Sequence, residues 1–132
     1  KMKKNQSLEV IEQWKIIMTS GQISNISKLI HEDAIFYSPV VFSPQKGKKK
    51  VIKYLSSAVE IFKNKNFLYK KFYNHKNLTF AEFEANFNNV IVNGIDLIST
   101  QNNLIYEFKV FVRPLKGIEA VWSSMREKLG QS

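Results

Sequence analysis

Asp96 is the residue whose type and position most directly suggest chemistry. It is the only charged residue in the apolar run 91–98 (IVNGIDLI), whose composition indicates a buried strand. A buried carboxylate is costly unless it is hydrogen-bonded or neutral, and desolvation raises its pKa toward the range that suits general acid or base catalysis. The sequence therefore predicts Asp96 as a catalytic residue. The alternative is a core acid that only accepts hydrogen bonds, from Trp14, Tyr54 or Arg113.

Few other residues are suited to chemistry. The chain has no cysteine, which excludes disulfide bonds and thiolate metal sites. His31 and His75 are too isolated in the sequence to suggest a metal site, so we expect no metal and no cofactor. Arg113 precedes Pro114 at the end of a predicted strand. There it would either clamp a ligand carboxylate or pair with an acid such as Glu107.

Length and composition indicate one soluble domain. The 132 residues suffice for a single hydrophobic core, and the chain is 44% hydrophobic and 13% aromatic. Residues 1–6 are expected to be disordered or to derive from the expression vector. No apolar run approaches the roughly 20 residues of a transmembrane helix, and the first residues lack the apolar core of a signal peptide. We therefore expect a cytoplasmic protein that does not bind membranes.

The net charge of +9 raises the question of nucleic-acid binding. The only arginines are Arg113 and Arg126, and arginine is the favoured residue for recognising phosphates and bases. The lysines are spread along the chain instead of forming one patch. We therefore expect no nucleic-acid partner, although the charge favours anionic ligands through long-range attraction.

Hydrophobic periodicity predicts a mixture of helices and strands. The predicted helices run from Ser7 to the Gly21 stop, and over Ser24–Ile30, Lys48–Lys63 and Leu115–Leu129. The predicted strands are Ala34–Ser38, Phe67–Tyr73, Leu78–Phe87, Val90–Ser99 and Leu104–Val112. This order predicts an α+β fold with one curved, mostly antiparallel sheet.

Alternation along the predicted strands divides their residues between two faces. The face of Asp96 would carry Val92, Gly94, Ile98, Phe108, Val110, Val112, Ala81, Phe83 and Ala85. The opposite, outer face would carry Ile105, Glu107, Lys109, Phe111, Phe80, Glu82 and Glu84. The mixed apolar and charged character of the outer face suits a homodimer interface better than bulk solvent.

Three stretches of the chain resemble the nuclear transport factor 2-like superfamily, which includes ketosteroid isomerases and polyketide cyclases. They are the segment Trp14–Val40 with DAIFYSPV at its end, GIDLI (94–98), and LIYEFKVFVRPL (104–115). The resemblance covers nearly the whole chain. It implies a cone-shaped domain in which a strongly bent sheet wraps around helices and encloses an apolar pocket. It also implies a homodimer formed through the outer sheet face.

The resemblance also assigns roles to single residues. In the isomerases an aspartate base moves a proton next to a ketone, while a tyrosine and a protonated aspartic acid stabilise the enolate oxygen. The base position falls on Ser38, the tyrosine position on Trp14 and the oxyanion aspartate position on Asp96. Serine cannot act as the base unaided and an indole cannot act as an acid, so steroid isomerisation by this mechanism is not expected. Polyketide cyclases use a pocket aspartate in aldol ring closure, and Asp96 is the equivalent residue.

Two functions therefore remain open. In the first, the protein binds a small apolar carbonyl compound and acts on it by isomerase-type or cyclase-type acid–base chemistry through Asp96. In the second, it is a non-catalytic module that binds an apolar ligand or a protein partner. The predicted pocket residues are Trp14, Met18, Phe36, Ser38, Tyr54, Phe83, Ile98, Phe108 and Val110.

Overall fold

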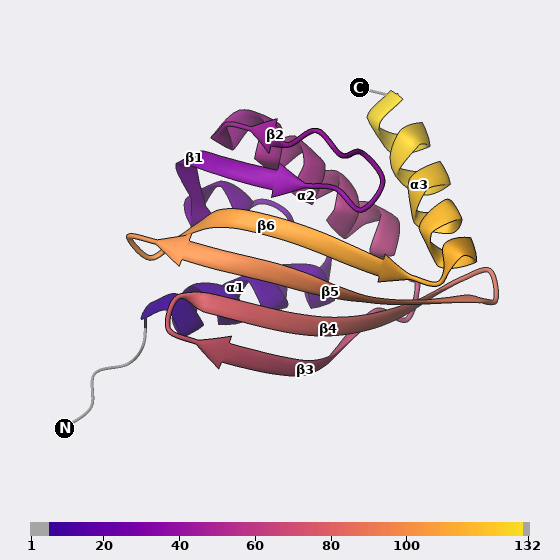
Figure 1. Cartoon of the computed structure of the whole chain (residues 1–132), viewed down its shortest axis with the longest axis horizontal. Coiled ribbons are helices and arrows are strands. Elements are labelled where there is room, and N and C mark those ends of the chain that lie inside the picture. The colour runs from indigo at the N-terminus through magenta and orange to yellow at the C-terminus, as the bar shows by residue number, and fades with distance from the viewer. Residues whose placement is uncertain (1–5, 131–132) are drawn as a thin grey trace.

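The computed structural model describes residues 6–130 and shows an α+β fold built on one sheet (Figure 1). Residues 1–5 and 131–132 lie outside the described residues, and with them most of the segment expected to be disordered or vector-derived. In chain order the elements are α1 (Gln6–Ser20), the 3-10 helix η1 (Ile26–Leu29), β1 (Ile30–Tyr37), β2 (Gln45–Lys46), α2 (Lys48–Phe62), β3 (Leu68–His75), β4 (Leu78–Phe87), β5 (Val90–Gln101), β6 (Leu104–Arg113) and α3 (Leu115–Gly130).

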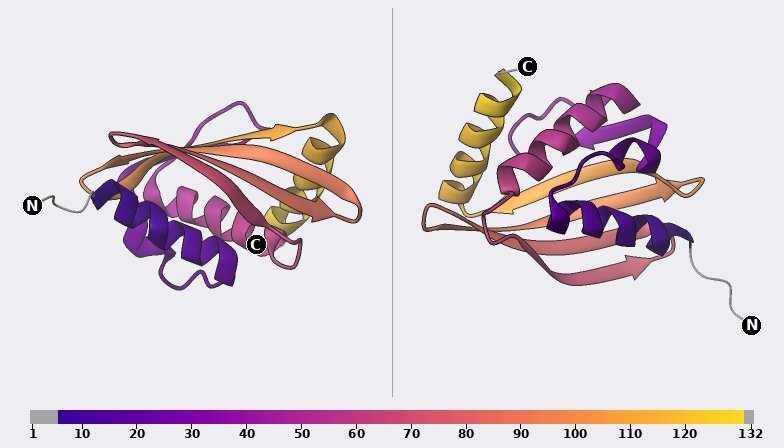
Figure 2. Two further views of the ribbon diagram at one scale, coloured as in Figure 1. Left: turned by 90° about the horizontal axis from the view of Figure 1, so that it is seen from below. Right: turned by 180° about the vertical axis from the view of Figure 1, so that it is seen from behind.

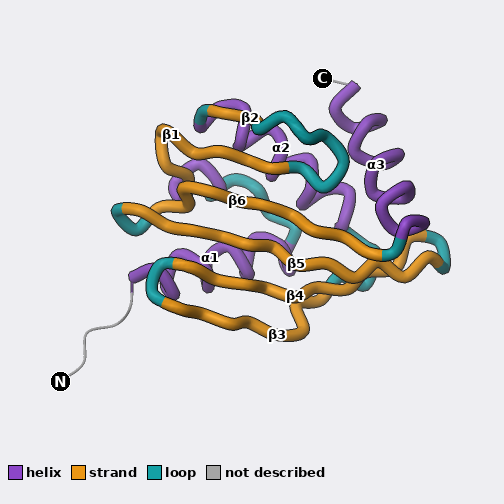
Figure 3. The backbone as a smooth tube through the Cα atoms, viewed as in Figure 1, coloured by secondary structure: helices purple, strands orange, loops and turns teal. Residues whose placement is uncertain are grey.

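The six strands form a single sheet in the order β2-β1-β6-β5-β4-β3. Strands β3 to β6 pair with one another as an antiparallel meander, whereas β1 pairs with β6 in parallel. The sheet bends around α1 and α2 on one face, and α3 stands at one end (Figure 2). Short turns connect the consecutive strands β3, β4, β5 and β6, and the longer loop after β1 runs toward α3 (Figure 3). This architecture confirms the predicted fold class.

The α2 helix forms where apolar residues recur at helical spacing. Val51, Leu55 and Val59 give it one fully buried stripe. It begins after Gly47, whose φ of 102° belongs to the backbone region that favours glycine. Within residues 6–130, no helix is both long and apolar enough to cross a membrane.

The register of β4, β5 and β6 fixes which side chains share the inner face with Asp96. Asp96 pairs with Ala81 on one side and with Val110 on the other. Two residues before Asp96, on the same face, Gly94 pairs with Phe83 of β4 and with Val112 of β6. Apart from Ile105, the inner and outer sets agree with the alternation predicted from the sequence.

The predicted helix Ser24–Ile30 was wrong in extent and in type. Only Ile26–Leu29 are helical, and they form a single 3-10 turn in which Asn25 makes no side-chain capping bond. Ile30 already belongs to β1, where it pairs with Ile105 of β6. The last residue of the predicted helix therefore belongs to a strand that pairs in parallel with β6. Periodicity in so short a segment does not reveal such a pairing.

Ile105 was predicted on the outer face but is completely buried. Ser99 pairs with Glu107 whereas Thr100 pairs with Ile105, so β6 carries one additional residue, Tyr106, at this point. A β-bulge of this kind reverses the side-chain alternation on one side of the bulge. Ile105 and Phe108 therefore both face the core although they are three positions apart.

Candidate functional site

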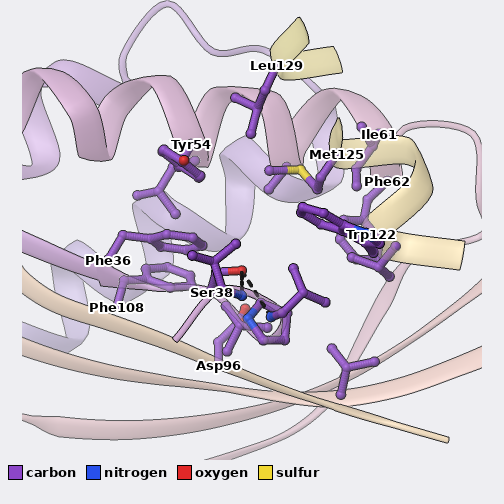
Figure 4. A pocket seen from close by; sticks show the side chains of 18 of the residues that line it. Phe36, Ser38, Tyr54, Ile61, Phe62, Asp96, Phe108, Trp122, Met125 and Leu129 are labelled. Atoms are coloured by element: carbon purple, nitrogen blue, oxygen red, sulfur yellow. Dashed lines mark hydrogen bonds between the residues drawn. The ribbon is translucent and has the colours of Figure 1, made fainter. Parts of the chain in front are cut away.

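A cavity of about 380 Å³ lies between the inner face of the sheet, α2, α3 and the loop after β1. Figure 4 shows Asp96 on the sheet side of this space and Leu129 of α3 on the opposite side. The volume falls at the lower end of the range typical of small-molecule sites, and the lining is almost entirely apolar. This cavity is therefore the candidate functional site.

Most of the predicted pocket residues line the cavity. They are Trp14, Met18, Phe36, Ser38, Tyr54, Phe83, Phe108 and Val110, together with Asp96. Ile98 does not line it: its side chain is fully buried in the core, opposite Phe108 on β6 and Thr79 on β4. The predicted lining residues thus come from the sheet, from Ser38 directly after β1, and from α1 and α2.

The other half of the lining comes from α2, α3 and the loop after β1, where Tyr54 and Ser38 were the only predicted pocket residues. The α2 helix contributes Leu55, Ala58, Ile61 and Phe62, α3 contributes Val121, Trp122, Met125, Arg126, Leu129 and Gly130, and the loop contributes Pro39, Val40 and Val41. The apolar stripe of α3 is visible in the sequence. What the stripe does not reveal is that α3 stands far enough from the sheet to leave a space, because that distance depends on tertiary packing.

Asp96 is bound by a residue that the sequence analysis did not identify. The Tyr69 hydroxyl of β3 lies 2.5 Å from Oδ2 of Asp96, and the indole Nε1 of Trp14 lies 2.8 Å from the same hydroxyl. The three side chains come from β5, β3 and α1, and together they form one hydrogen-bonded chain. The expected contact between Trp14 and Asp96 thus exists only through Tyr69.

The chemistry of these groups sets the direction of both hydrogen bonds. An indole N–H only donates, so the oxygen of Tyr69 accepts from Trp14 and directs its own proton to Oδ2 of Asp96. The other oxygen, Oδ1, has no hydrogen-bond partner among the described residues. Every fully buried polar side-chain atom of these residues does have a partner, so Oδ1 is not fully buried. Because Asp96 lines the cavity and retains 5% exposure, Oδ1 faces that space.

Burial gives Asp96 an unusual acidity. Desolvation raises the pKa of its carboxyl from 3.8 to about 7, and the hydrogen bond from Tyr69 opposes part of this rise. Burial, followed by the charge of Asp96, holds the pKa of Tyr69 well above 10, so this phenol keeps its proton. Near neutral pH both forms of Asp96 are populated, and a proton on the carboxyl occupies Oδ1, since Oδ2 is engaged by Tyr69.

The remaining candidates do not contact Asp96. Nη1 of Arg113 is 3.2 Å from Oδ1 of Asn93 at the exposed end of β6, and Arg113 does not line the cavity. The ring of Tyr54 packs 5.5 Å from that of Phe36, and its hydroxyl makes no hydrogen bond to any of the described residues. Nor do three His, Asp or Glu side chains of residues 6–130 gather as a metal site would require.

Ser38, at the position that the resemblance assigns to the catalytic base, already has partners. Its Oγ accepts the backbone N–H groups of Val40 at 3.1 Å and Val41 at 3.3 Å. These bonds shape the start of the loop that borders the cavity (Figure 4). A hydroxyl used in this way does not replace a carboxylate base.

The irregular pairing of β3 explains why Tyr69 was missed. Tyr69 pairs with Phe83, whereas Lys71 already pairs with Glu82, so β3 contains an additional residue between them. Tyr69 and Phe72 both pack against the core cluster as a result, although simple alternation would place them on opposite faces. The strand LYKKFYNH also contains Tyr73, and nothing in the sequence distinguishes Tyr69 from it.

No protein-family model matches the chain, and no curated protein matches it in sequence. Several solved structures, however, are similar to this chain. A steroid delta-isomerase from Pseudomonas aeruginosa is 25% identical, with a TM-score of 0.91 over 97% of this chain and 94% of that chain. An NTF2-like protein of unknown function from Mesorhizobium loti is 14% identical, with a TM-score of 0.75 over 86% and 96% of the two chains. A putative SnoaL-like polyketide cyclase from Jannaschia sp. CCS1 is 10% identical, with a TM-score of 0.72 over 92% and 96%. These similarities confirm the predicted cone-shaped fold.

Proposed function

We propose that the cavity of this chain, whose fold is similar to those of a steroid delta-isomerase and of NTF2-like proteins, binds a small apolar carbonyl compound and that Asp96 exchanges a proton with it. One observation carries the proposal. Tyr69 holds Oδ2 of Asp96, and this leaves Oδ1 directed into an apolar cavity. A carboxyl with a pKa of about 7 is matched to proton transfer at neutral pH.

Each protonation state of Asp96 has a role in this proposal. The neutral acid donates a hydrogen bond from Oδ1 to the carbonyl oxygen of the ligand. The carboxylate removes a proton from the carbon next to the carbonyl, which leaves neutral Asp96 and an enolate. Asp96 then returns the proton to that carbon or to its conjugated partner. The Tyr69 hydrogen bond stabilises the carboxylate form, and the apolar lining strengthens every such interaction by excluding water.

A second candidate is passive binding of an apolar ligand. The three-group mechanism of the isomerases is not supported, since Ser38 is engaged with the backbone and Trp14 with Tyr69. Among the described residues that line the cavity there is no second carboxyl and no histidine. Asp96 would therefore act alone or would only bind.

Hydrogen exchange into a ketone separates these two functions. The wild-type protein is expected to accelerate deuterium uptake next to the carbonyl of β-tetralone, followed by proton NMR in heavy water. Asp96→Asn should lose this acceleration by a factor of about 100 or more, which is the usual contribution of general acid–base catalysis. Asp33→Asn is the matched control, because Asp33 is the other aspartate of the chain and is exposed. Binding of β-tetralone without any exchange would assign the passive role.

We also propose that the outer face of the sheet pairs two copies of the chain. Ile95 and Phe111 are neighbours in the register of β5 and β6, and their side chains are 38% and 52% exposed. Phe80 on β4 is exposed on the same face. Charged residues such as Glu82 lie between them, as in interfaces that also tolerate water.

Phe111→Glu should weaken this dimer at least about tenfold, because it replaces an exposed apolar side chain of this face with a charge beside Ile95. Sedimentation velocity over a range of protein concentrations would measure the effect. Leu115→Glu is the control, since Leu115 is 70% exposed but lies on α3 outside this face. A wild-type protein that sediments as a monomer at every concentration would refute the proposed pairing.

A further inference from the structure

We infer that the ligand carries an anionic group, and that Arg126 binds this group at the mouth of the cavity. The inference rests on the proposed function and adds a ligand class to it. Among residues 6–130, two charged side chains line the cavity, and they differ in position: Asp96 is buried on the sheet, while Arg126 is exposed on α3. One ligand that contacts both would need a carbonyl at its inner end and an anion at its outer end.

Arg126 lies at the rim beside Trp122, and no carboxylate of residues 6–130 neutralises it. Its guanidinium carbon lies 5.5 Å from the ring centre of Trp122, another lining residue one helical turn earlier. Within the described part of the chain, no carboxylate lies within ion-pair distance of Arg126. The neighbouring Lys128, in contrast, is paired with Glu60 at 2.9 Å. The described residues therefore leave the guanidinium donors of Arg126 available.

Stacking on Trp122 suits Arg126 to binding an anion. It restricts the long side chain, so less conformational entropy is lost when a ligand binds. The planar guanidinium can bind a carboxylate or sulfonate through two parallel hydrogen bonds. The net charge of +9 attracts such ligands from a distance.

The lining between the two charges defines the middle of the ligand. Met125 and Leu129 of α3 face Phe36 and Phe108 across the space (Figure 4). A polar segment would lose its hydration there without gaining partners. The geometry therefore points to a compact amphipathic anion, such as an apolar oxo-carboxylic acid, whose keto group reaches Oδ1 of Asp96 while its carboxylate stays at the rim.

Two dyes with the same apolar body test this inference. Anilinonaphthalene sulfonate carries a sulfonate, and N-phenylnaphthylamine is its neutral counterpart. Fluorescence titration should show that Arg126→Gln weakens binding of the sulfonate about fivefold or more and leaves the neutral dye unchanged, as expected for one charge-assisted contact near solvent. Added salt should weaken sulfonate binding more strongly in the wild type than in Arg126→Gln, because only the wild type has the guanidinium at the cavity mouth.

Two control variants complete the design. Lys116→Gln makes the same charge change at an exposed position of the same helix outside the lining, and should alter neither titration. Ala58→Phe narrows the cavity and should weaken both dyes, which locates them inside it. The anion site is overturned if Arg126→Gln weakens both dyes equally or affects neither. If the wild type fails to bind even the neutral dye, the proposed binding function fails with it.

Discussion

Gly94→Ala is expected to lower the free energy of unfolding by about 3 kcal/mol or more, because a methyl group has no room at this position. A Cβ atom would lie 2.4 Å from Cζ of Phe83 and 2.5 Å from the backbone oxygen of Phe111. Phe83 cannot yield easily, since it is 2% exposed and its ring contacts those of Phe62, Phe67 and Tyr69. The backbone of β6 cannot yield without breaking its pairing with β5.

Urea denaturation would measure this effect. Gly130→Ala is the control, because an added Cβ there meets nothing within 4 Å. Since Phe83 also lines the cavity, the soluble fraction of Gly94→Ala should bind N-phenylnaphthylamine differently from the wild type. A loss below about 1 kcal/mol would contradict this prediction and would show that Phe83 can move away from position 94 at little cost.

Asp96→Asn is expected to stabilise the protein at neutral and alkaline pH but not in acid. The pKa of Asp96 rises from 3.8 to about 7 in the folded state. Between these values the folded state binds more protons than the unfolded state, so wild-type stability falls as pH rises through this window. A shift of this size corresponds to at most about 4 kcal/mol. Asparagine keeps an acceptor for Tyr69 and does not ionise, so the free energy of unfolding of the variant does not fall in this way as the pH rises.

The comparison is made by urea denaturation of both proteins near pH 4 and near pH 8. The two free energies of unfolding should be similar near pH 4, where Asp96 is neutral, and Asp96→Asn should be the more stable near pH 8. Asp33→Asn serves as the control for removal of one exposed carboxylate. If Asp96→Asn were instead the less stable protein near pH 8, Asp96 would be a stabilising ionised acceptor and its catalytic role would be lost.

The fold was predictable because most elements have regular patterns. Leu78–Phe87 alternates without interruption, and its predicted bounds are those of β4. The side of the sheet that carries Asp96 followed from the same rule. The errors lie where a second strand alters the pattern: the parallel pairing with β6 extends β1 back to Ile30, and the bulge at Tyr106 turns Ile105 inward.

The site was less predictable than the fold. The carboxylate was identified from its apolar surroundings alone, but its partner Tyr69 lies 27 residues away and beside an irregularity in β3. Arg126 carries no local signal, because a charged residue on a helix is usually solvated. Its position at the cavity mouth depends on how α3 packs against the rest of the molecule. Local sequence patterns do not contain that information.

The central claim is that Asp96 titrates near neutral pH inside the folded cavity. Carbon NMR of protein labelled only at aspartate carboxyl groups tests it most directly, because the chain has just two aspartates, Asp33 and Asp96. The resonance that disappears in Asp96→Asn identifies Asp96. We expect this resonance to titrate with a midpoint of about 7. A midpoint below about 5 would show an ordinary ionised carboxylate and would contradict the proposed proton exchange.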